Sequence, residues 1–286
     1  NLKDSISSIA SEFYNNPSEK INIVGVTGTN GKTSSVYWLT QSLKNLQRRA
    51  KMIGTIGYGS IDKLKPNENT TPDAIEFQRI LSEFRHDEVQ DVCVEVSSHG
   101  IKQGRVNNVD FDVRLFTNLS RDHLDYHNSI ESYAKTKKDF LLSAKKGNLV
   151  VNIDDPIGKE IFYESRLDRQ QKLSFAIDTK SHLQAKNLIR GDKVTKFDLI
   201  YRHKLYEIVV PVVGKYNIYN ILGVIGSLIS LQYRIEDIIA VLKFLGPVPG
   251  RAEFVDVGLG YQPKVIIDYA HTPDALKNAL DSIKSL

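Results

Sequence analysis

The residues best suited to chemistry form a short turn near the start of the chain. Residues 23–27 predict a buried strand, and the next six are Gly28, Thr29, Asn30, Gly31, Lys32 and Thr33. Small residues let backbone N–H groups surround an anion, and the dipole of a following helix favours negative charge there. Lys32 would reach the β- and γ-phosphates of a nucleotide, and the Thr33 hydroxyl would hold magnesium. The turn predicts a phosphate loop, although Val26 stands where the common G-x-x-x-x-G-K-[ST] pattern has glycine; an ordinary strand-to-helix turn is the alternative.

An acid stands at the carboxyl end of a second predicted strand. Glu95 lies near the end of the mostly apolar run over 91–96. Ligands of open α/β sheets bind at this edge, and a carboxylate buried among valines is costly unless it is paired or coordinates a cation. Glu95 is therefore predicted to be a second magnesium ligand, with a capping or ion-paired glutamate as the alternative.

Histidines, acids and lysines follow the next predicted strand. Residues 122–127 include His123 and His127 with two acids, which taken alone is a weak metal signal; solvated loop histidines are the alternative. Lys135, Lys137 and Lys138 lie in a helical stretch, where a charged surface face is the ordinary interpretation.

Short β-branched runs alternate with longer helical patterns, which is typical of an α/β fold with a mostly parallel sheet flanked by helices. Strands are predicted over 21–27, 91–96, 113–117, 148–152, 172–176 and 264–268. Helices are predicted over 33–48, 74–84 and 217–231, with a last one beginning near Thr272. Residues 183–213 alternate in the manner of an antiparallel edge added to the sheet.

Composition limits the class of protein. In 286 residues, 38 Lys and Arg against 34 Asp and Glu leave a charge of +4, too mild to indicate a nucleic-acid partner. The single cysteine, Cys93, excludes a disulfide framework and favours a reducing, cytoplasmic setting. No apolar stretch of about 18 residues appears, so membrane insertion is not expected. A breaker-rich segment over 246–250 predicts a domain boundary.

The segment Gly25–Thr33 resembles the ATP loop of the Mur ligases and of the folylpolyglutamate synthases. Further motifs lie at 69–72, 95–100, 122–127, 214–220, 249–253 and 268–274. In this order they resemble the Mur ligase family, most closely its branch that adds the third amino acid to UDP-N-acetylmuramoyl-L-alanyl-D-glutamate. The resemblance implies a P-loop NTPase-like central domain over 19–246 and the start of a Rossmann-like C-terminal domain over 247–286. Residues 1–18 would link to a missing N-terminal UDP-binding domain, since the chain lacks a starting methionine.

The resemblance implies a role for each matching residue. Lys137 matches a lysine that the family carbamylates, and with Lys32 and His123 it would be catalytic. Thr33 and Glu95 would hold one of two magnesium ions, and His123 and Lys137 would hold the other. ATP would be bound by Gly28, Thr29, Asn30, Gly31, Lys32, Thr33, Ser34, Asn220, Arg251, Asp268 and His271. The muramoyl dipeptide would be held by Thr70, Thr71, Ser97, Gln103 and Arg105.

The implied reaction is ATP-dependent amide-bond formation in peptidoglycan precursor synthesis. The D-glutamate γ-carboxylate would attack the γ-phosphorus, giving an acyl phosphate and ADP, and the amine of a diamino acid would then displace phosphate. meso-Diaminopimelate is the expected amine, with L-lysine as the alternative. Three further hypotheses stay open: a folylpolyglutamate synthase-like ligase, a nucleotide switch, and a fragment that binds nucleotide without catalysis. A monomer is expected.

Overall fold

An 11-stranded sheet runs through the computed structural model, which describes residues 2–143, 147–191, 194–255 and 265–283. Its order is β11-β10-β9-β8-β7-β6-β1-β5-β2-β3-β4, and neighbouring strands pair in parallel from β9 to β2. Both edges are antiparallel. The strands are β1 (Asn22–Thr27), β2 (Ala50–Gly54), β3 (Gly57–Ser60), β4 (Lys63–Lys65), β5 (Asp91–Glu95), β6 (Val113–Phe116), β7 (Asn148–Asn152), β8 (Lys172–Ala176), β9 (Leu183–Arg190), β10 (Thr195–Tyr201) and β11 (Lys204–Val210). The α/β architecture predicted from the sequence is confirmed.

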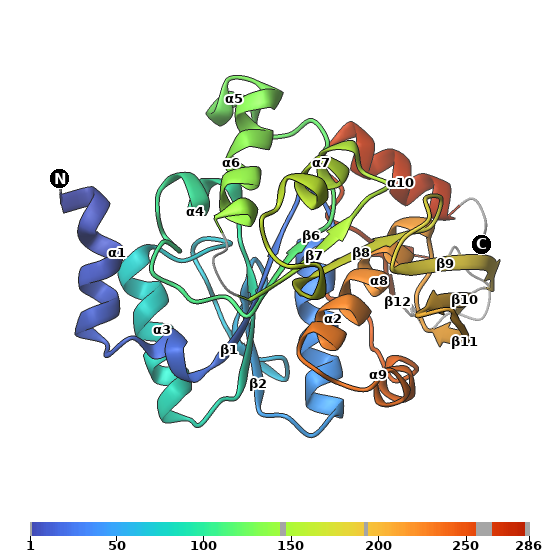
Figure 1. Cartoon of the computed structure of the whole chain (residues 1–286), viewed down its shortest axis with the longest axis horizontal. Coiled ribbons are helices and arrows are strands. Elements are labelled where there is room, and N and C mark those ends of the chain that lie inside the picture. Colours follow the sequence, from blue (N-terminus) through green and yellow to red (C-terminus); the bar gives the residue numbers. More distant parts are fainter. Residues whose placement is uncertain (1, 144–146, 192–193, 256–264, 284–286) are drawn as a thin grey trace.

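Helices cover both faces of this sheet (Figure 1). The α-helices are α1 (Leu2–Phe13), α2 (Lys32–Asn45), α3 (Ala74–His86), α4 (Ser98–Lys102), α5 (Leu124–His127), α6 (Ile130–Leu142), α7 (Pro156–Glu164), α8 (Lys215–Ser230), α9 (Ile235–Leu242) and α10 (Pro273–Ile283). Two short 3-10 helices lie at Pro17–Lys20 and Arg169–Gln171. A separate hairpin pairs β12 (Glu253–Val255) with β13 (Val265–Ile267).

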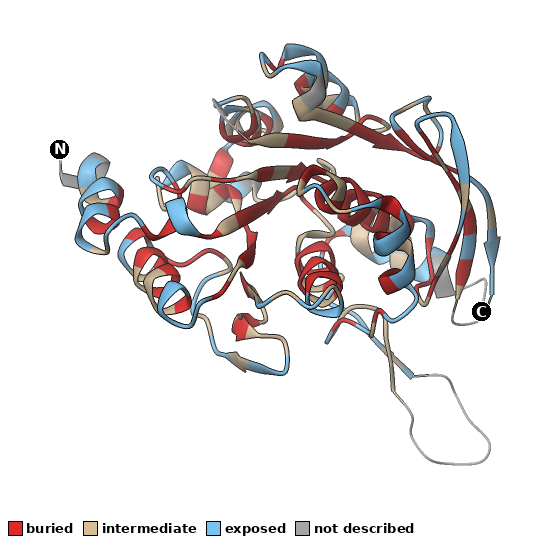
Figure 2. Cartoon of the chain, turned by 60° about the horizontal axis from the view of Figure 1, so that its bottom comes forward, coloured by how far each residue is buried: buried red, intermediate tan, exposed pale blue. Residues whose placement is uncertain are grey.

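Alternation along the central strands divides the core into two layers. Val24 and Val26 of β1 pack with α2, α8 and α9, whereas Ile23 packs with α3, α6 and α7 on the other face. Successive strand side chains point to opposite faces, so a strand covered on both sides is apolar at nearly every position. Figure 2 shows the central strands as mostly buried, with exposed residues on the outer turns of the helices.

Most predicted elements appear where the sequence placed them. The alternating segment over 183–213 forms β9, β10 and β11 at one edge of the sheet. The last predicted strand is β13, with position 264 outside the described residues. The helix predicted over 33–48 ends earlier, at Asn45.

Several elements were not predicted, among them the short helices α4, α5 and α7 and the strand β12. Residues expected to form only a linker contain α1, which buries Ser7, Ala10 and Ser11 beside α3. The antiparallel edge from β2 to β4 and helix α9 were also missed. The β2–β4 edge and α9 are short, whereas α1 has a clear helical pattern that was assigned to a linker; α1 packs against α3, a contact between distant segments that a local pattern does not contain.

Cys93 lies fully buried in β5 as a free thiol, and burial raises its pKa to about 12. Within the described ranges, no helix has the length and apolar character needed to cross a bilayer.

Candidate active site

A cavity of about 800 Å³ opens where the strands β1, β5, β6 and β7 end. The loops after these strands line it, together with the first turn of α8, residues of the segment 268–271, and α10. The carboxyl edge of a parallel sheet is the usual ligand-binding edge of this kind of fold. The cavity is therefore the candidate active site.

The turn after β1 has the backbone of a phosphate loop. Gly31 caps α2 with a left-handed φ of 85°, and a Cβ added to it would lie 2.2 Å from Asn220 Oδ1. Gly28 has a φ of 150°, and a Cβ there would lie 1.9 Å from Thr117 Oγ1. Both positions thus require glycine, for conformation and for space. The loop is a preformed site for an anion at the start of a 14-residue helix.

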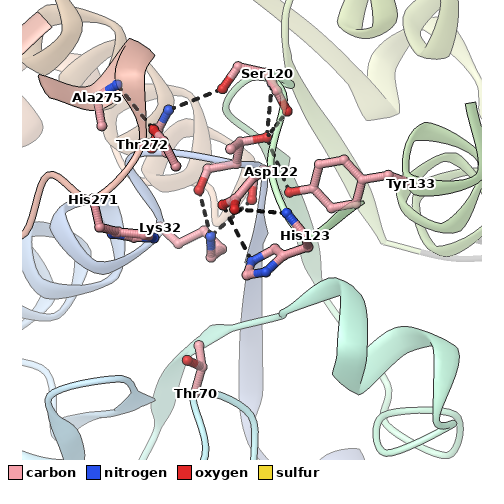
Figure 3. A network of polar contacts seen from close by, with 12 residues as sticks. Lys32, Thr70, Ser120, Asp122, His123, Tyr133, His271, Thr272 and Ala275 are labelled. Atoms are coloured by element: carbon pink, nitrogen blue, oxygen red, sulfur yellow. Dashed lines mark hydrogen bonds and ion pairs between the residues drawn. The ribbon is translucent and has the colours of Figure 1, made fainter. Parts of the chain in front are cut away.

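Lys32 folds back over this loop. Its Nζ donates to the carbonyl oxygens of Gly28 at 3.0 Å and Thr29 at 2.8 Å. Burial lowers the pKa of Lys32, while the charges of Glu95 and Asp122 act in the opposite direction. Figure 3 shows Lys32, Asp122 and His123 directed toward one another in the cavity. A cation is therefore held at the position where the sequence predicts a nucleotide's terminal phosphates.

Glu95 is fully buried and links two parts of the cavity. Its Oε2 accepts from Thr33 Oγ1 at 3.0 Å and Thr55 Oγ1 at 3.2 Å, and its Oε1 accepts from Thr55 N at 2.9 Å. Arg251 reaches the same place, with Nη2 donating to Thr33 Oγ1 at 3.2 Å. Burial raises the pKa of Glu95, against the charge of Lys32. A hydroxyl and a carboxylate side by side are ligands suited to Mg²⁺, so this pair fits the predicted metal.

Lys137 is the buried lysine of its helix. Only 1% exposed, it donates from Nζ to Gly28 O at 3.0 Å and lies 4.6 Å from the centre of the Tyr133 ring. Burial lowers its pKa well below the ordinary value, and the nearby charge of Lys32 lowers it further. Its neighbours differ: Lys135 pairs with Asp139 at 2.7 Å, and Lys138 contacts two glutamates of α7. The prediction of a charged surface face is thus confirmed for Lys135 and Lys138, whereas Lys137 is buried and reaches the phosphate loop.

The two histidines of residues 122–127 differ in their environment. His123 lines the cavity with a left-handed φ of 52°, and its Nε2 lies 3.4 Å from Asp122 Oδ2. His127 is fully buried, and neither of its ring nitrogens has a hydrogen-bond partner among the described residues. The alternative of solvated loop histidines is therefore wrong for His127, which packs against His99 of α4 and Tyr133 of α6. In the described part of the chain, no three His, Cys, Asp or Glu side chains gather closely enough to hold a metal.

The five residues expected to hold the acceptor substrate are brought together. Thr71 Oγ1 donates to Glu95 O at 2.7 Å and lies 3.1 Å from Ser97 Oγ. Arg105 donates to Thr71 O at 2.6 Å and to Gln103 Oε1 at 2.6 Å. Thr70, Ser97 and Arg105 line the cavity, whereas Thr71, which is buried, and Gln103, which is exposed, do not line it but contact residues that do.

The residues expected at the nucleotide come from three separate segments. Asn220 of α8 is buried against Gly31 and donates to Asn217 Oδ1 at 3.2 Å. Asp268 accepts from Ala252 N and Ala270 N, each at 2.8 Å. Along with Arg251 and His271, both residues line the cavity, as do positions 29–34. Gly28, the first residue of the loop, does not line the cavity.

Some cavity residues were missed by the sequence analysis. Asp154 and Asp155 follow β7, and Asp155 caps α7 and accepts from Leu119 N at 2.7 Å. The rule that selected Glu95, an acid at the carboxyl end of a predicted strand, also selects them. The sequence also contains a signal for the burial of Lys137. This lysine lies three or four residues from Tyr133, Ala134, Phe140 and Leu141, all of which face the core.

A nucleoside-triphosphate-dependent α/β ligase is the class of protein that this fold and cavity fit. The family description "Mur ligase middle domain" matches residues 26–228, and the chain belongs to the Mur ligase family. The UDP-N-acetylmuramoyl-L-alanyl-D-glutamate--2,6-diaminopimelate ligase 1 of Clostridium acetobutylicum is 37% identical over 272 residues, covering 95% of this chain and 55% of that protein. The corresponding ligase of Xylella fastidiosa strain 9a5c is 38% identical, covering 99% of this chain and 57% of that protein.

Solved structures show the same likeness. A UDP-N-acetylmuramoyl-L-alanyl-D-glutamate--2,6-diaminopimelate ligase superposes with a TM-score of 0.85 at 25% identity, covering 99% of this chain and 58% of that one. The MurF ligase of Thermotoga maritima, solved in complex with ADP, shares the fold at a TM-score of 0.76 and 19% identity, covering 99% of this chain and 61% of that one. The chain thus spans a little over half the length of the curated relatives it matches.

Proposed function

We propose that the protein carrying this chain is an ADP-forming ligase that adds meso-diaminopimelate to UDP-N-acetylmuramoyl-L-alanyl-D-glutamate. The observation that carries the proposal is the position of Glu95. Its carboxylate is bonded to Thr33 of the phosphate loop and to Thr55, and the Thr55 hydroxyl lies 3.0 Å from that of Thr70 in the acceptor segment. One buried acid therefore joins the two substrate regions, and the names of the relatives supply the substrates.

Magnesium fits the residues near the phosphate loop. Thr33 and Glu95 offer oxygen ligands to one ion, and His123 with a carbamylated Lys137 would serve a second. When bound, these ions would neutralise charge on the transferring phosphoryl group. A neutral amine is needed to react with carbon dioxide: the nitrogen bonds to carbon and a proton leaves to solvent. The lowered pKa of Lys137 favours that neutral amine, and the product would supply negative charge.

The chain's own residues would mainly position and stabilise the reactants. The amides of the phosphate loop and Lys32 would hold the γ-phosphate, while Arg105, Ser97 and Thr70 would orient the acceptor. The D-glutamate carboxylate oxygen would then bond to phosphorus as the bond to ADP breaks. Attack by the amine on the resulting acyl phosphate would release phosphate and form the amide.

The domain organisation is part of the same proposal. Residues 19–246 would form the central ATP-binding domain, 247–286 the beginning of a C-terminal domain, and 1–18 the connection to a domain that precedes it. In support, the β12–β13 hairpin forms a sheet of its own, separate from the main sheet. The monomeric state and the cytoplasmic location stay predictions.

ADP release in the natural protein that carries this chain tests the function. With Mg²⁺, ATP and UDP-N-acetylmuramoyl-L-alanyl-D-glutamate, we expect release that depends on meso-diaminopimelate and exceeds that with L-lysine. Faster release with L-lysine would overturn the proposed amine. ADP release with a folate and glutamate in place of both substrates would overturn the proposed substrate class. If no pair of acceptor and amine gave ADP release, the proposed ligase activity would be overturned.

A further inference from the structure

Asp154 connects two loops beside the nucleotide region of the cavity. Its carboxylate accepts from three consecutive backbone N–H groups between β8 and β9, those of Ile177 at 2.7 Å, Asp178 at 2.9 Å and Thr179 at 2.8 Å. Its Oδ2 also accepts from the Tyr219 hydroxyl of α8 at 2.9 Å. One side chain thus holds the end of β7, the turn after β8 and the start of α8 together.

The first turn of α8 is attached to the same place by a second contact. Lys215 Nζ lies 2.9 Å from Asp178 Oδ2, and the Tyr219 hydroxyl lies 3.5 Å from that oxygen. The Lys215 pair is half exposed and is therefore weak. Tyr219 is the more enclosed partner, so its bond to Asp154 is the stronger attachment of the two.

The residue after Tyr219 faces the phosphate loop. Asn220 packs so closely on Gly31 that no side chain fits there. Two adjacent residues of α8 therefore contact Asp154 and the phosphate loop, respectively. Asp154, Tyr219, Asn220 and Gly31 all line the cavity.

The charge of Asp154 suits this role. Burial alone would raise its pKa, but the hydrogen bonds from the loop and from Tyr219 outweigh burial and keep the pKa below its ordinary value. The Tyr219 pKa is raised by burial and by the Asp154 carboxylate, so the hydroxyl keeps its proton. A bond from a neutral hydroxyl to a carboxylate is charge-assisted and stronger than a neutral one.

We propose that Asp154 and Tyr219 are a positioning pair, which sets the first turn of α8 at the distance from the phosphate loop that a nucleoside polyphosphate requires. The proposal rests on the nucleotide site of the proposed function. It concerns only the nucleoside half of the ligand, because neither residue lies in the phosphate loop. A ligand with phosphates and no nucleoside should not depend on the pair.

Calorimetric titrations with Mg²⁺–ADP and with Mg²⁺–tripolyphosphate distinguish binding of the nucleoside from binding of the phosphates. For Tyr219→Phe we expect about fivefold weaker ADP binding, since a charge-assisted hydrogen bond is lost, and tripolyphosphate binding within about twofold of the wild type. Asp154→Asn should also weaken ADP binding and leave tripolyphosphate binding nearly unchanged, and the double variant should lose less than the sum of the two single losses, because both changes weaken the same hydrogen bond. Tyr163→Phe, whose ring is 72% exposed on α7, is the matched control and should bind both ligands as the wild type does.

The proposal would be overturned if Tyr219→Phe weakened the binding of both ligands equally, or if it did not weaken the binding of ADP. Fully additive losses in the double variant would also overturn it, because residues coupled through a shared hydrogen bond give non-additive losses. Melting temperatures identify any variant that fails to fold. If Asp154→Asn does not fold, the binding data for Tyr219→Phe, which keeps the aromatic ring, test the proposal by themselves. A wild-type chain that binds neither ligand would instead refute the nucleotide site on which the pair depends.

Discussion

The Thr33 hydroxyl donates to the Glu95 carboxylate at 3.0 Å across 62 residues of sequence. Parallel pairing of β1 with β5 brings them together, because Val26 and Glu95 are partners in the register and Thr33 lies one loop further on. Gly54 completes the arrangement, since a Cβ there would lie 2.2 Å from Glu95 Oε1. The carboxylate is thus buried with hydroxyl and amide donors around it, in a place suited to a cation.

Glu95→Gln should weaken metal binding without lowering the stability of the metal-free protein. Burial disfavours the charged carboxylate, whereas a glutamine whose oxygen takes the Oε1 position still accepts from Thr55 N, and its NH2 group can donate to the hydroxyls of Thr33 and Thr55. Without metal, we expect a melting temperature equal to the wild type or about 2 °C higher. With Mg²⁺ and ADP the wild type should gain stability and the variant should gain little. Glu160→Gln, on the surface, is the control; a full Mg²⁺-dependent gain in Glu95→Gln would contradict the metal assignment.

Lys137→Ala should abolish ADP release in the natural protein. The variant removes the buried amine beside Gly28, and with it the proposed carbamate. Added bicarbonate should not restore turnover, whereas acetate should restore part of it by placing a carboxylate in the vacated space. Lys135→Ala removes an exposed lysine of the same helix and should have no effect. Full activity of Lys137→Ala would refute the role of this residue.

Gly31→Ala should lose nucleotide binding and stability. The residue has a left-handed φ of 85°, and the new Cβ would meet Asn220 Oδ1 at 2.2 Å. Gly250→Ala is a control for backbone strain alone, since Gly250 has a φ of 65° and open space around it. We expect about 1 kcal/mol of lost stability in Gly250→Ala and more in Gly31→Ala, measured by denaturant unfolding. Equal losses would show that the contact with Asn220 is unimportant.

His127→Phe should change how stability depends on pH. Burial lowers the pKa of His127 to about 4 from 6.5 in the unfolded chain. As pH falls from 6.5 toward 4, the unfolded chain takes up a proton that the folded chain does not, so the free energy of unfolding falls. The fall should be smaller in His127→Phe, and at pH 7.5 the variant should be at least as stable, because it removes two buried nitrogens that have no hydrogen-bond partner among the described residues.

Denaturant unfolding at pH 7.5, 6 and 5 checks that prediction. His86→Gln, at an exposed position at the end of α3, is the control and should keep the wild-type pH dependence. The same fall in stability for His127→Phe and the wild type would show that another group causes the acid sensitivity.

The sequence by itself determined the parts of this protein that depend on near neighbours. Strand, glycine turn and helix are adjacent from Asn22 to Asn45, so backbone propensity and side-chain spacing predict the phosphate loop. The ends of the parallel strands were predictable too, since the fold class places them at one edge. Glu95 could therefore be placed at that edge before its contacts were known, whereas the roles of His123 and of the residues expected to hold the dipeptide came only from the family resemblance.

Only the tertiary structure decided which side chains touch and which are buried. The contacts of Asn220 with Gly31, of Tyr219 with Asp154 and of Lys137 with Gly28 each join segments tens to hundreds of residues apart. Such contacts depend on the sheet order and on the way helices pack across it, which local spacing does not encode. His127 shows the same limit, because packing between helices removed it from the solvent that its polar sequence surroundings had suggested.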